Sequence, residues 1–233
     1  MSDLLGTLPL SVWPSTWTPR AVVFDLDGTL VNTEAEWVAV QDRYLAEHGA
    51  SISEQTRRDI TGRAAEVVVL AIARAVDKDP HLVGRELVDA HREGMRGRDG
   101  FAMLPGALAT VAAIAAKVPV VIASNSPRDM LDHKLEVTGL LALVDAHVAI
   151  EDVPLPKPAP DMYHHAAALL GAEPSAALAF EDSETGAEAA LAAGLNLIAI
   201  PSLPGQDPQA HLRLTSLEDP QLQSWIAGWE SVR

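Results

Sequence analysis

Polar residues follow several apolar runs of this chain, and their types and spacing could do chemistry. The run Ala21 to Phe24 is followed by Asp25 and, two residues later, by Asp27. A carboxylate at the end of a strand can attack phosphorus and divide one difficult displacement into two easier ones. A second carboxylate two residues along an extended chain points to the same side, where it can protonate a leaving oxygen and then activate water. Gly28 permits the tight turn that follows, and Thr29 can hydrogen-bond locally to hold it.

Further polar groups come later in the chain. Ser124 and Asn125 end an apolar run, a pattern that is also ordinary turn chemistry. Lys157 lies between two prolines that restrict its backbone, and its compact positive charge could bind phosphoryl oxygens. Glu181 and Asp182 are adjacent acids that could supply hard oxygen ligands for magnesium. The same acids could also favour the start of a helix, and both interpretations can hold at once.

The elements that must position these residues are short, continuously apolar runs with helical stretches between them. Continuous apolarity suits strands buried on both faces, and helical patterns such as Gly106 to Ala116 suit right-handed crossovers. We predict an α/β fold with a Rossmann-like, doubly wound parallel sheet, in which ligands bind beyond the carboxyl ends of the strands. The predicted strands are Ala21 to Phe24, Val118 to Ala123, Ala146 to Ile150, Ala177 to Phe180 and Leu195 to Ile200.

The segment 35–100 has helical apolar spacing and no convincing strand, so we predict a small α-helical cap domain inserted after the first strand. The polar connectors on either side of it are plausible hinges. Residues 20–34 and 101–233 then form the core domain. Residues 1–19 form an N-terminal arm, for which core packing and partial disorder are both open.

Four segments resemble the four signatures of the haloacid dehalogenase superfamily, and they occur in the order of that family. They are DLDGTLVNTE (25–34), IASNS (122–126), PKPAPDMY (156–163) and FEDSETG (180–186). The resemblance runs from about Val22 to Ile200. It implies a Mg²⁺-dependent phosphatase that hydrolyses a small phosphorylated metabolite, a sugar phosphate or similar, through an aspartyl-phosphate intermediate. Asp25 would be the nucleophile and Asp27 the acid/base.

The resemblance also implies a set of binding residues. Those expected to bind the phosphoryl group are Thr29, Ser124, Asn125 and Lys157. Those expected to hold Mg²⁺ are Asp25, Asp27 through its backbone carbonyl, Asp182 and Glu181. In related enzymes the second acid of the pair is the usual direct ligand, so Asp182 is favoured over Glu181.

The position of the insertion is similar to that of the helical cap in subfamily I, which includes phosphoglycolate phosphatases, sugar-phosphate phosphatases and β-phosphoglucomutase. A cap that closes over the site would exclude water and present residues to the leaving group. Arg63 is the first candidate for a substrate contact by this analogy, and Glu34 is the second. Surface charge or packing within the cap would also explain both residues.

The composition restricts the partners. A formal net charge of −15 argues against non-specific nucleic-acid binding, and it requires a locally positive site if the substrate is a phosphate. The absence of cysteine excludes disulfides, thiolate metal sites and cysteine nucleophiles. No apolar run is long enough to cross a bilayer, and no secretory signal is evident. We therefore expect a cytoplasmic monomer or homodimer that binds a small phosphorylated metabolite and neither nucleic acid nor membrane.

Several alternatives stay open. A hexose-phosphate mutase resembling β-phosphoglucomutase would use the same phosphoryl chemistry, although that enzyme has a cap histidine at the position of Trp37. True dehalogenases resemble the chain in fold but lack the second aspartate and need no magnesium. Phosphonoacetaldehyde hydrolases need a cap lysine, and Lys78 is the candidate available. In another class, the chain would be a non-catalytic phosphate-sensing module, which has no need for both Asp25 and Asp27.

Overall fold

The computed structural model describes residues 16–60, 65–95, 100–203 and 205–232. Most of the predicted N-terminal arm lies outside the described residues. The chain divides into two compact units. The core unit comprises Met1–Asn32, Gly100–Ser202 and Gln206–Arg233, and the helical unit comprises Thr33–Asp99 and Leu203–Gly205.

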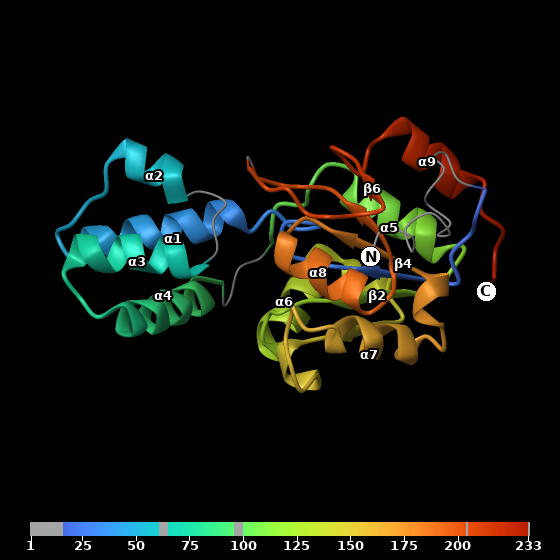
Figure 1. Ribbon diagram of the computed structural model, residues 1–233, viewed down its shortest axis with the longest axis horizontal. Coiled ribbons are helices and arrows are strands. Elements are labelled where there is room, and N and C mark those ends of the chain that lie inside the picture. Colours follow the sequence, from blue (N-terminus) through green and yellow to red (C-terminus); the bar gives the residue numbers. More distant parts are fainter. Residues whose placement is uncertain (1–15, 61–64, 96–99, 204, 233) are drawn as a thin grey trace. The chain divides into compact units, whose positions relative to one another are not determined.

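The core unit is built around a six-stranded sheet with the strand order β3-β2-β1-β4-β5-β6 (Figure 1). All neighbouring strands run parallel. Because β2 and β3 lie on one side of β1 and the later strands on the other, the chain reverses its direction of travel across the sheet beside β1. Such switch points are where open α/β sheets bind ligands. The strands are β1 (Ala21–Phe24), β2 (Val120–Ala123), β3 (Ala146–Val148), β4 (Ala177–Glu181), β5 (Asn196–Ala199) and β6 (Leu212–Arg213).

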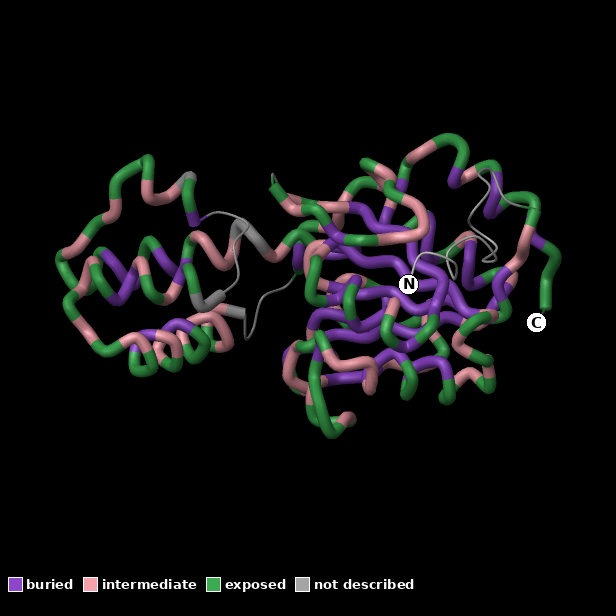
Figure 2. The backbone as a smooth tube through the Cα atoms, viewed as in Figure 1, coloured by how far each residue is buried: buried purple, intermediate pink, exposed green. Residues whose placement is uncertain are grey.

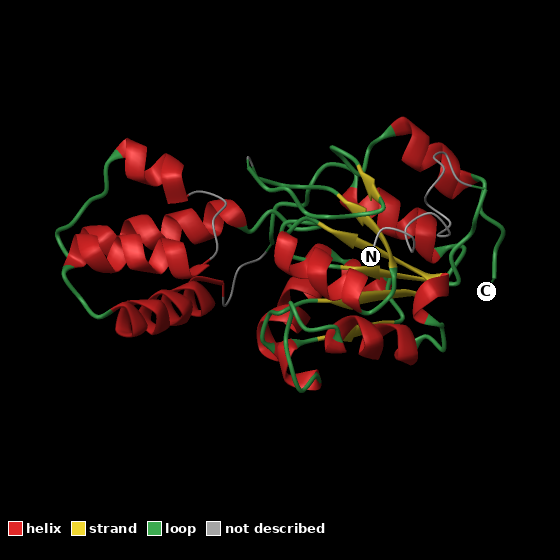
Figure 3. Cartoon of the chain, in the orientation of Figure 1, coloured by secondary structure: helices red, strands yellow, loops and turns green. Residues whose placement is uncertain are grey.

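Helices of the core unit pack against this sheet, as Figure 3 shows. Helices α7 and α8 contact each other as well as neighbouring strands, whereas α5 contacts β2 and the C-terminal helix α9. No helix in the described part of the chain is both long and apolar enough to span a bilayer. The core helices are α5 (Ala107–Ala115), α6 (Arg128–Thr138), α7 (Asp161–Leu169), α8 (Glu184–Ala192) and α9 (Pro220–Ala227).

The central strands are covered on both faces. Every residue of β1, β2, β4 and β5 is buried, which appears in Figure 2 as continuous purple through the sheet. Phe24 and Phe180 stack across the β1–β4 pair with ring centroids 4.6 Å apart. Alanines on the buried side of α8, such as Ala187 and Ala190, allow that helix to pack closely against the sheet. This packing fixes the strand ends that carry the polar residues.

The helical unit has an apolar core of its own. Its helices are α1 (Glu34–Glu47), α2 (Glu54–Ile60), α3 (Ala65–Val76) and α4 (Pro80–Met95). Buried residues recur at helical spacing, for example Val68 and Ile72 on α3 and Val83 and Leu87 on α4. Because all four helices contribute buried residues to a shared cluster, they stabilise one another without a sheet.

The predicted fold class is confirmed: the core is a Rossmann-like, doubly wound parallel sheet, with helices inserted after the first strand. The limits of four predicted strands differ. Strand β4 extends one residue further, to Glu181, and strand β5 spans Asn196–Ala199 and not Leu195 to Ile200. Strand β2 begins at Val120 and not Val118, because Pro119 has no backbone N–H to donate to the sheet. Strand β3 ends at Val148, where the chain turns into a short 3-10 helix, Ile150–Asp152.

Candidate active site

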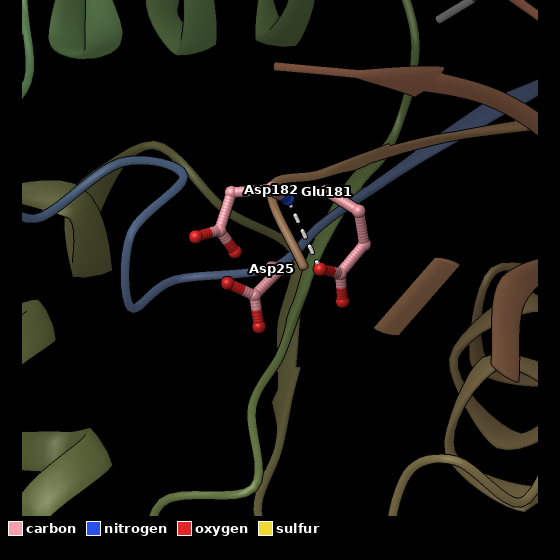
Figure 4. Close-up of side chains that lie close together, drawn as sticks. All are labelled: Asp25, Glu181 and Asp182. Carbon is pink, nitrogen blue, oxygen red and sulfur yellow. Dashed lines mark hydrogen bonds between the residues drawn. The ribbon is translucent and has the colours of Figure 1, made fainter. Parts of the chain in front are cut away.

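Acidic side chains gather at the edge of the sheet where the parallel strands β1 and β4 end. Asp25 follows β1 directly, Glu181 is the last residue of β4, and Asp182 comes next. One carboxylate oxygen from each residue lies within 4.8 Å of the other two. Figure 4 shows the three carboxylates close together, Asp25 at the end of β1 and the other two at the end of the neighbouring strand β4. The sequence places these groups together because β1 and β4 are paired in parallel.

Lys157 links these acids. Its ammonium donates hydrogen bonds to Asp25 Oδ1 at 2.7 Å and Glu181 Oε1 at 2.7 Å. A third bond goes to the carbonyl of Ala123 at the end of β2, at 2.9 Å. Asn125 holds the lysine backbone from both sides, because its Nδ2 donates to the Lys157 carbonyl and its Oδ1 accepts from the Lys157 N–H, each at 3.1 Å. The ammonium is therefore fixed among the ends of three strands, β1, β2 and β4.

Asp25 has one paired and one unpaired oxygen. Its Oδ2 is buried and has no hydrogen-bond partner among the described residues. Burial raises the pKa of the Asp25 carboxyl well above its ordinary value; the Lys157 ammonium opposes this shift, and the charges of Glu181 and Asp182 add to it. A buried unpaired carboxylate oxygen is costly, so this atom is available to a cation or an electrophile.

Glu181 is fully buried, and protein donors occupy both of its oxygens. Besides Lys157, Tyr163 donates to Oε1 at 2.7 Å. The backbone N–H of Asp182 donates to Oε2 at 3.1 Å, and the hydroxyl of Ser183 donates at 3.2 Å. Burial raises the pKa of the Tyr163 hydroxyl, and the charge of Glu181 adds to the shift. Glu181 therefore supports the Lys157 ammonium in addition to lying in the acidic cluster.

Asp182 lies against a glycine and a loop. Its Oδ2 accepts hydrogen bonds from Ser202 Oγ at 2.7 Å and Gln206 Nε2 at 3.4 Å. A Cβ on Gly28 would lie 2.2 Å from the same oxygen, so only glycine fits there. Burial raises the pKa of Asp182 to about 7, and the Glu181 charge contributes, although both loop donors act in the opposite direction.

Asp27 lies in a separate group of donors. Lys134 on α6 donates to its Oδ1 at 2.5 Å, and Ser126 and Ser124 donate to its Oδ2 at 2.8 Å and 3.1 Å. Burial alone would raise the pKa of Asp27, but the Lys134 ammonium and these hydrogen bonds outweigh burial and hold it below the ordinary value. The site therefore contains a carboxyl with a raised pKa, Asp25, and one with a lowered pKa.

The residues fit a divalent cation. The carboxylates of Asp25, Asp27, Glu181 and Asp182 face the ammonium groups of Lys134 and Lys157, which leaves two negative charges to be balanced. The available ligands are oxygen atoms, the donor type that Mg²⁺ and Ca²⁺ prefer. The unpaired Asp25 Oδ2 points to the same conclusion.

The predicted core residues come together at this edge, and the cap candidates cannot be placed. Thr29 is buried beside the turn, and its hydroxyl has no partner among the described residues. Ser124 donates to Asp27 here. Arg63 lies outside the described residues, and so does the side chain of Glu34.

Sequence reasoning missed six side chains that contact the predicted residues: Ser126, Lys134, Tyr163, Ser183, Ser202 and Gln206. Ser126 and Tyr163 fall inside matched segments, so their positions were a usable signal. Lys134 is ten residues beyond Ser124 on a helix, and Ser202 is in a loop after β5; no spacing rule marked either.

Comparison with known proteins agrees with this geometry. Residues 19–194 match the family model of the haloacid dehalogenase-like hydrolases. Hexitol phosphatase B of Escherichia coli (strain K12) is 33% identical over 215 residues, covering 87% of this chain and 96% of that protein. Validoxylamine A 7'-phosphate phosphatase of Streptomyces hygroscopicus subsp. limoneus is 30% identical over 186 residues, covering 76% and 83%.

A solved structure shows the same likeness. The HAD family hydrolase from Deinococcus radiodurans R1, described with bound phosphate and sodium, superposes with a TM-score of 0.68 at 32% identity. The match covers 90% of this chain and 96% of that one. From the family model, the relatives and the shared fold together, the chain belongs to the haloacid dehalogenase-like hydrolases.

Proposed function

We propose that this hydrolase is a Mg²⁺-dependent phosphatase that cleaves a small sugar phosphate or similar ester through an aspartyl-phosphate on Asp25. The observation that carries the proposal is the state of Asp25. Its Oδ1 is held by Lys157, while its buried Oδ2 is left without a partner beside Asp182. This is the arrangement that an anionic nucleophile needs in order to meet an anionic phosphate, because the ammonium offsets the repulsion between them.

In the first step, Asp25 Oδ2 forms a bond to phosphorus while the bond between phosphorus and the leaving oxygen breaks. Asp27 gives that oxygen a proton, so the alcohol departs neutral. Lys157 binds the phosphoryl oxygens, and we propose that the Thr29 hydroxyl, which has no described partner, donates to them too. Ser124 and Asn125 remain proposed phosphate contacts that would exchange their present partners for the substrate.

In the second step, Asp27 takes a proton from water as the water oxygen bonds to phosphorus. The bond between phosphorus and Asp25 breaks, and the carboxylate is restored together with inorganic phosphate. Asp27 then holds the proton that the next leaving oxygen needs. The lowered pKa of Asp27, due to Lys134, favours the base form that this second step uses.

We propose Mg²⁺ as the cation. Asp25, Asp182 and the backbone carbonyl of Asp27 would hold it, with Glu181 as a further proposed ligand. When bound, the ion supplies positive charge that neutralises the phosphoryl group and orients it in line with the nucleophile. Because Glu181 already accepts from Lys157 and Tyr163, Asp182 is the stronger ligand of the acidic pair.

The helical unit is proposed to act as a cap with limits near 35 and 100, and Arg63 and Glu34 as its substrate contacts. The substrate class is inferred from relatives: one is named for hexitols and another for a validoxylamine phosphate. Both names describe phosphatases, so hydrolysis is preferred over a mutase reaction.

The proposal is tested by phosphate release from a panel of hexose, hexitol and pentose phosphates, with Mg²⁺ or EDTA. Wild type should release phosphate only with the metal, and Asp25→Asn should abolish release while the fold, followed by circular dichroism, is unchanged. Release that persists in Asp25→Asn would refute the nucleophile. Interconversion of hexose phosphates that outpaces release would replace the phosphatase by a mutase.

A further inference from the structure

The carboxylate proposed as the acid/base has an ammonium partner of its own. We propose that Lys134 is a positioning residue, which holds the Asp27 carboxylate in the orientation from which it activates water. The inference rests on the proposed function and adds a residue that lies outside the four matched segments. Lys134 acts through Asp27, not on the phosphate.

Lys134 is buried to an extent that requires a specific partner. Its side chain is 3% exposed, although it belongs to α6, a helix on which Asp129 and Glu136 are exposed. Lysine is almost never fully buried unless it is paired. The Nζ atom lies 2.5 Å from Asp27 Oδ1 and 3.0 Å from Ser126 Oγ. Desolvation of this ammonium is therefore offset by contacts within the site.

The donors around Asp27 fix the plane of its carboxylate. Lys134 holds Oδ1, whereas the hydroxyls of Ser126 and Ser124 hold Oδ2 at 2.8 Å and 3.1 Å. The backbone N–H of Ser126 donates to Ser124 Oγ at 3.0 Å, which orients that hydroxyl in turn. An aspartate has two side-chain torsions, and donors on both oxygens restrict both. Its side chain is still 28% exposed, so water can reach it.

The two lysines serve different carboxylates. Lys157 donates to Asp25 and Glu181, while Lys134 donates to Asp27 and Ser126. Loss of Lys157 therefore affects attack on phosphorus, and loss of Lys134 affects the steps that move a proton. Misplacement of a reacting group by about 1 Å can cost on the order of 100-fold in rate.

The experiment separates these steps with p-nitrophenyl phosphate, whose leaving group departs without a proton. In single-turnover rapid-quench measurements, Lys134→Met should form the Asp25 phosphoenzyme within about threefold of the wild-type rate. Hydrolysis of that phosphoenzyme should slow by about 10- to 100-fold, because the water step needs a positioned base. Phosphoenzyme should accumulate in the variant as a consequence.

Lys117→Met is the matched control, since this lysine of the core unit also makes tertiary hydrogen bonds, to the carbonyls of Ala227 and Trp229. Both of its rates should equal those of wild type. Equal loss of both steps in Lys134→Met, or loss of neither, would overturn the positioning role. If Lys134→Met does not fold, the same comparison is made with Ser126→Ala, which removes the other side of the support. Absence of any phosphoenzyme in wild type would instead refute the proposed function.

Discussion

Substitution of Gly28 by alanine should weaken metal binding beyond its effect on folding. Gly28 has a φ of +91°, and a Cβ there would lie 2.2 Å from Asp182 Oδ2. The left-handed backbone alone costs alanine about 1–2 kcal/mol. To regain van der Waals contact, the carboxylate must move by about 1 Å. This shift removes the bond from Ser202, which adds about 1 kcal/mol.

We therefore expect Gly28→Ala to lower the free energy of unfolding by about 2–3 kcal/mol. Its affinity for Mg²⁺ should fall by about 10- to 100-fold, as when the supports of a metal ligand are removed. Gly139→Ala is the control, because Gly139 has a φ of +77° with no other atom within 4 Å of the added Cβ. It should lose about 1–2 kcal/mol and bind the metal normally.

The assay combines urea denaturation without metal with calorimetric titration by Mg²⁺. If Gly28→Ala and Gly139→Ala lose the same stability and both bind Mg²⁺ like wild type, Asp182 does not hold the metal from this position. If both lose metal affinity equally, backbone strain and not the approach of Cβ to Asp182 is responsible.

Four further predictions concern the same group of residues. Because burial raises the pKa of Asp182 to about 7 in the metal-free protein, protons should compete with Mg²⁺ for this carboxylate. The affinity for Mg²⁺, measured by calorimetric titration, should therefore fall by up to about tenfold per pH unit below pH 7. The raised pKa also means that Asp182 loses its proton at a higher pH in the folded protein than in the unfolded chain. The free energy of unfolding of the metal-free protein should therefore decline between about pH 4 and about pH 7 and recover with Mg²⁺, and a flat profile would contradict this. Lys157→Met should abolish phosphate release and lower stability by about 3–5 kcal/mol, since it leaves Asp25 and Glu181 buried without their cation, whereas measurable turnover in a folded variant would contradict the role of Lys157. Tyr163→Phe removes one of two donors to Glu181 Oε1, so it should cost about 1 kcal/mol and retain most activity, and a loss as large as that of Lys157→Met would show that the hydroxyl is essential.

The sequence allowed prediction of those parts of the site that depend on strand ends. Asp25, Ser124 and Glu181 come at or directly after buried apolar runs, and parallel pairing brings such positions to one edge whatever the details of packing. The signal was weakest where local sequence says little about tertiary contact. Strand β6 comprises Leu212 and Arg213, which is too short for a pattern, and it pairs in parallel with β5.

Lys134 illustrates the same limit within the site. In the sequence it is a charged residue on a polar helix, a pattern that favours a solvent-exposed position. Its burial depends on how α6 packs beside the turn after β1, a contact between residues 107 positions apart in the chain. No local periodicity encodes such a contact, whereas the four matched segments were recognisable because their residues are close together in sequence.

The two lysines divide the acidic residues into two groups whose pKa values are shifted in opposite directions. Around Lys157, Asp25 and Asp182 have raised pKa values, because burial disfavours their charged forms and neighbouring carboxylates add to the shift. Around Lys134, Asp27 has a lowered pKa, because its ammonium and hydroxyl donors are sufficient without an ion. A cation bound there would favour the ionised form of Asp25, the proposed nucleophile, whereas protein donors already favour the ionised form of Asp27. In a chain with a net charge of −15, we expect a cation at this site to favour both the approach of an anionic phosphate and the ionisation of Asp25.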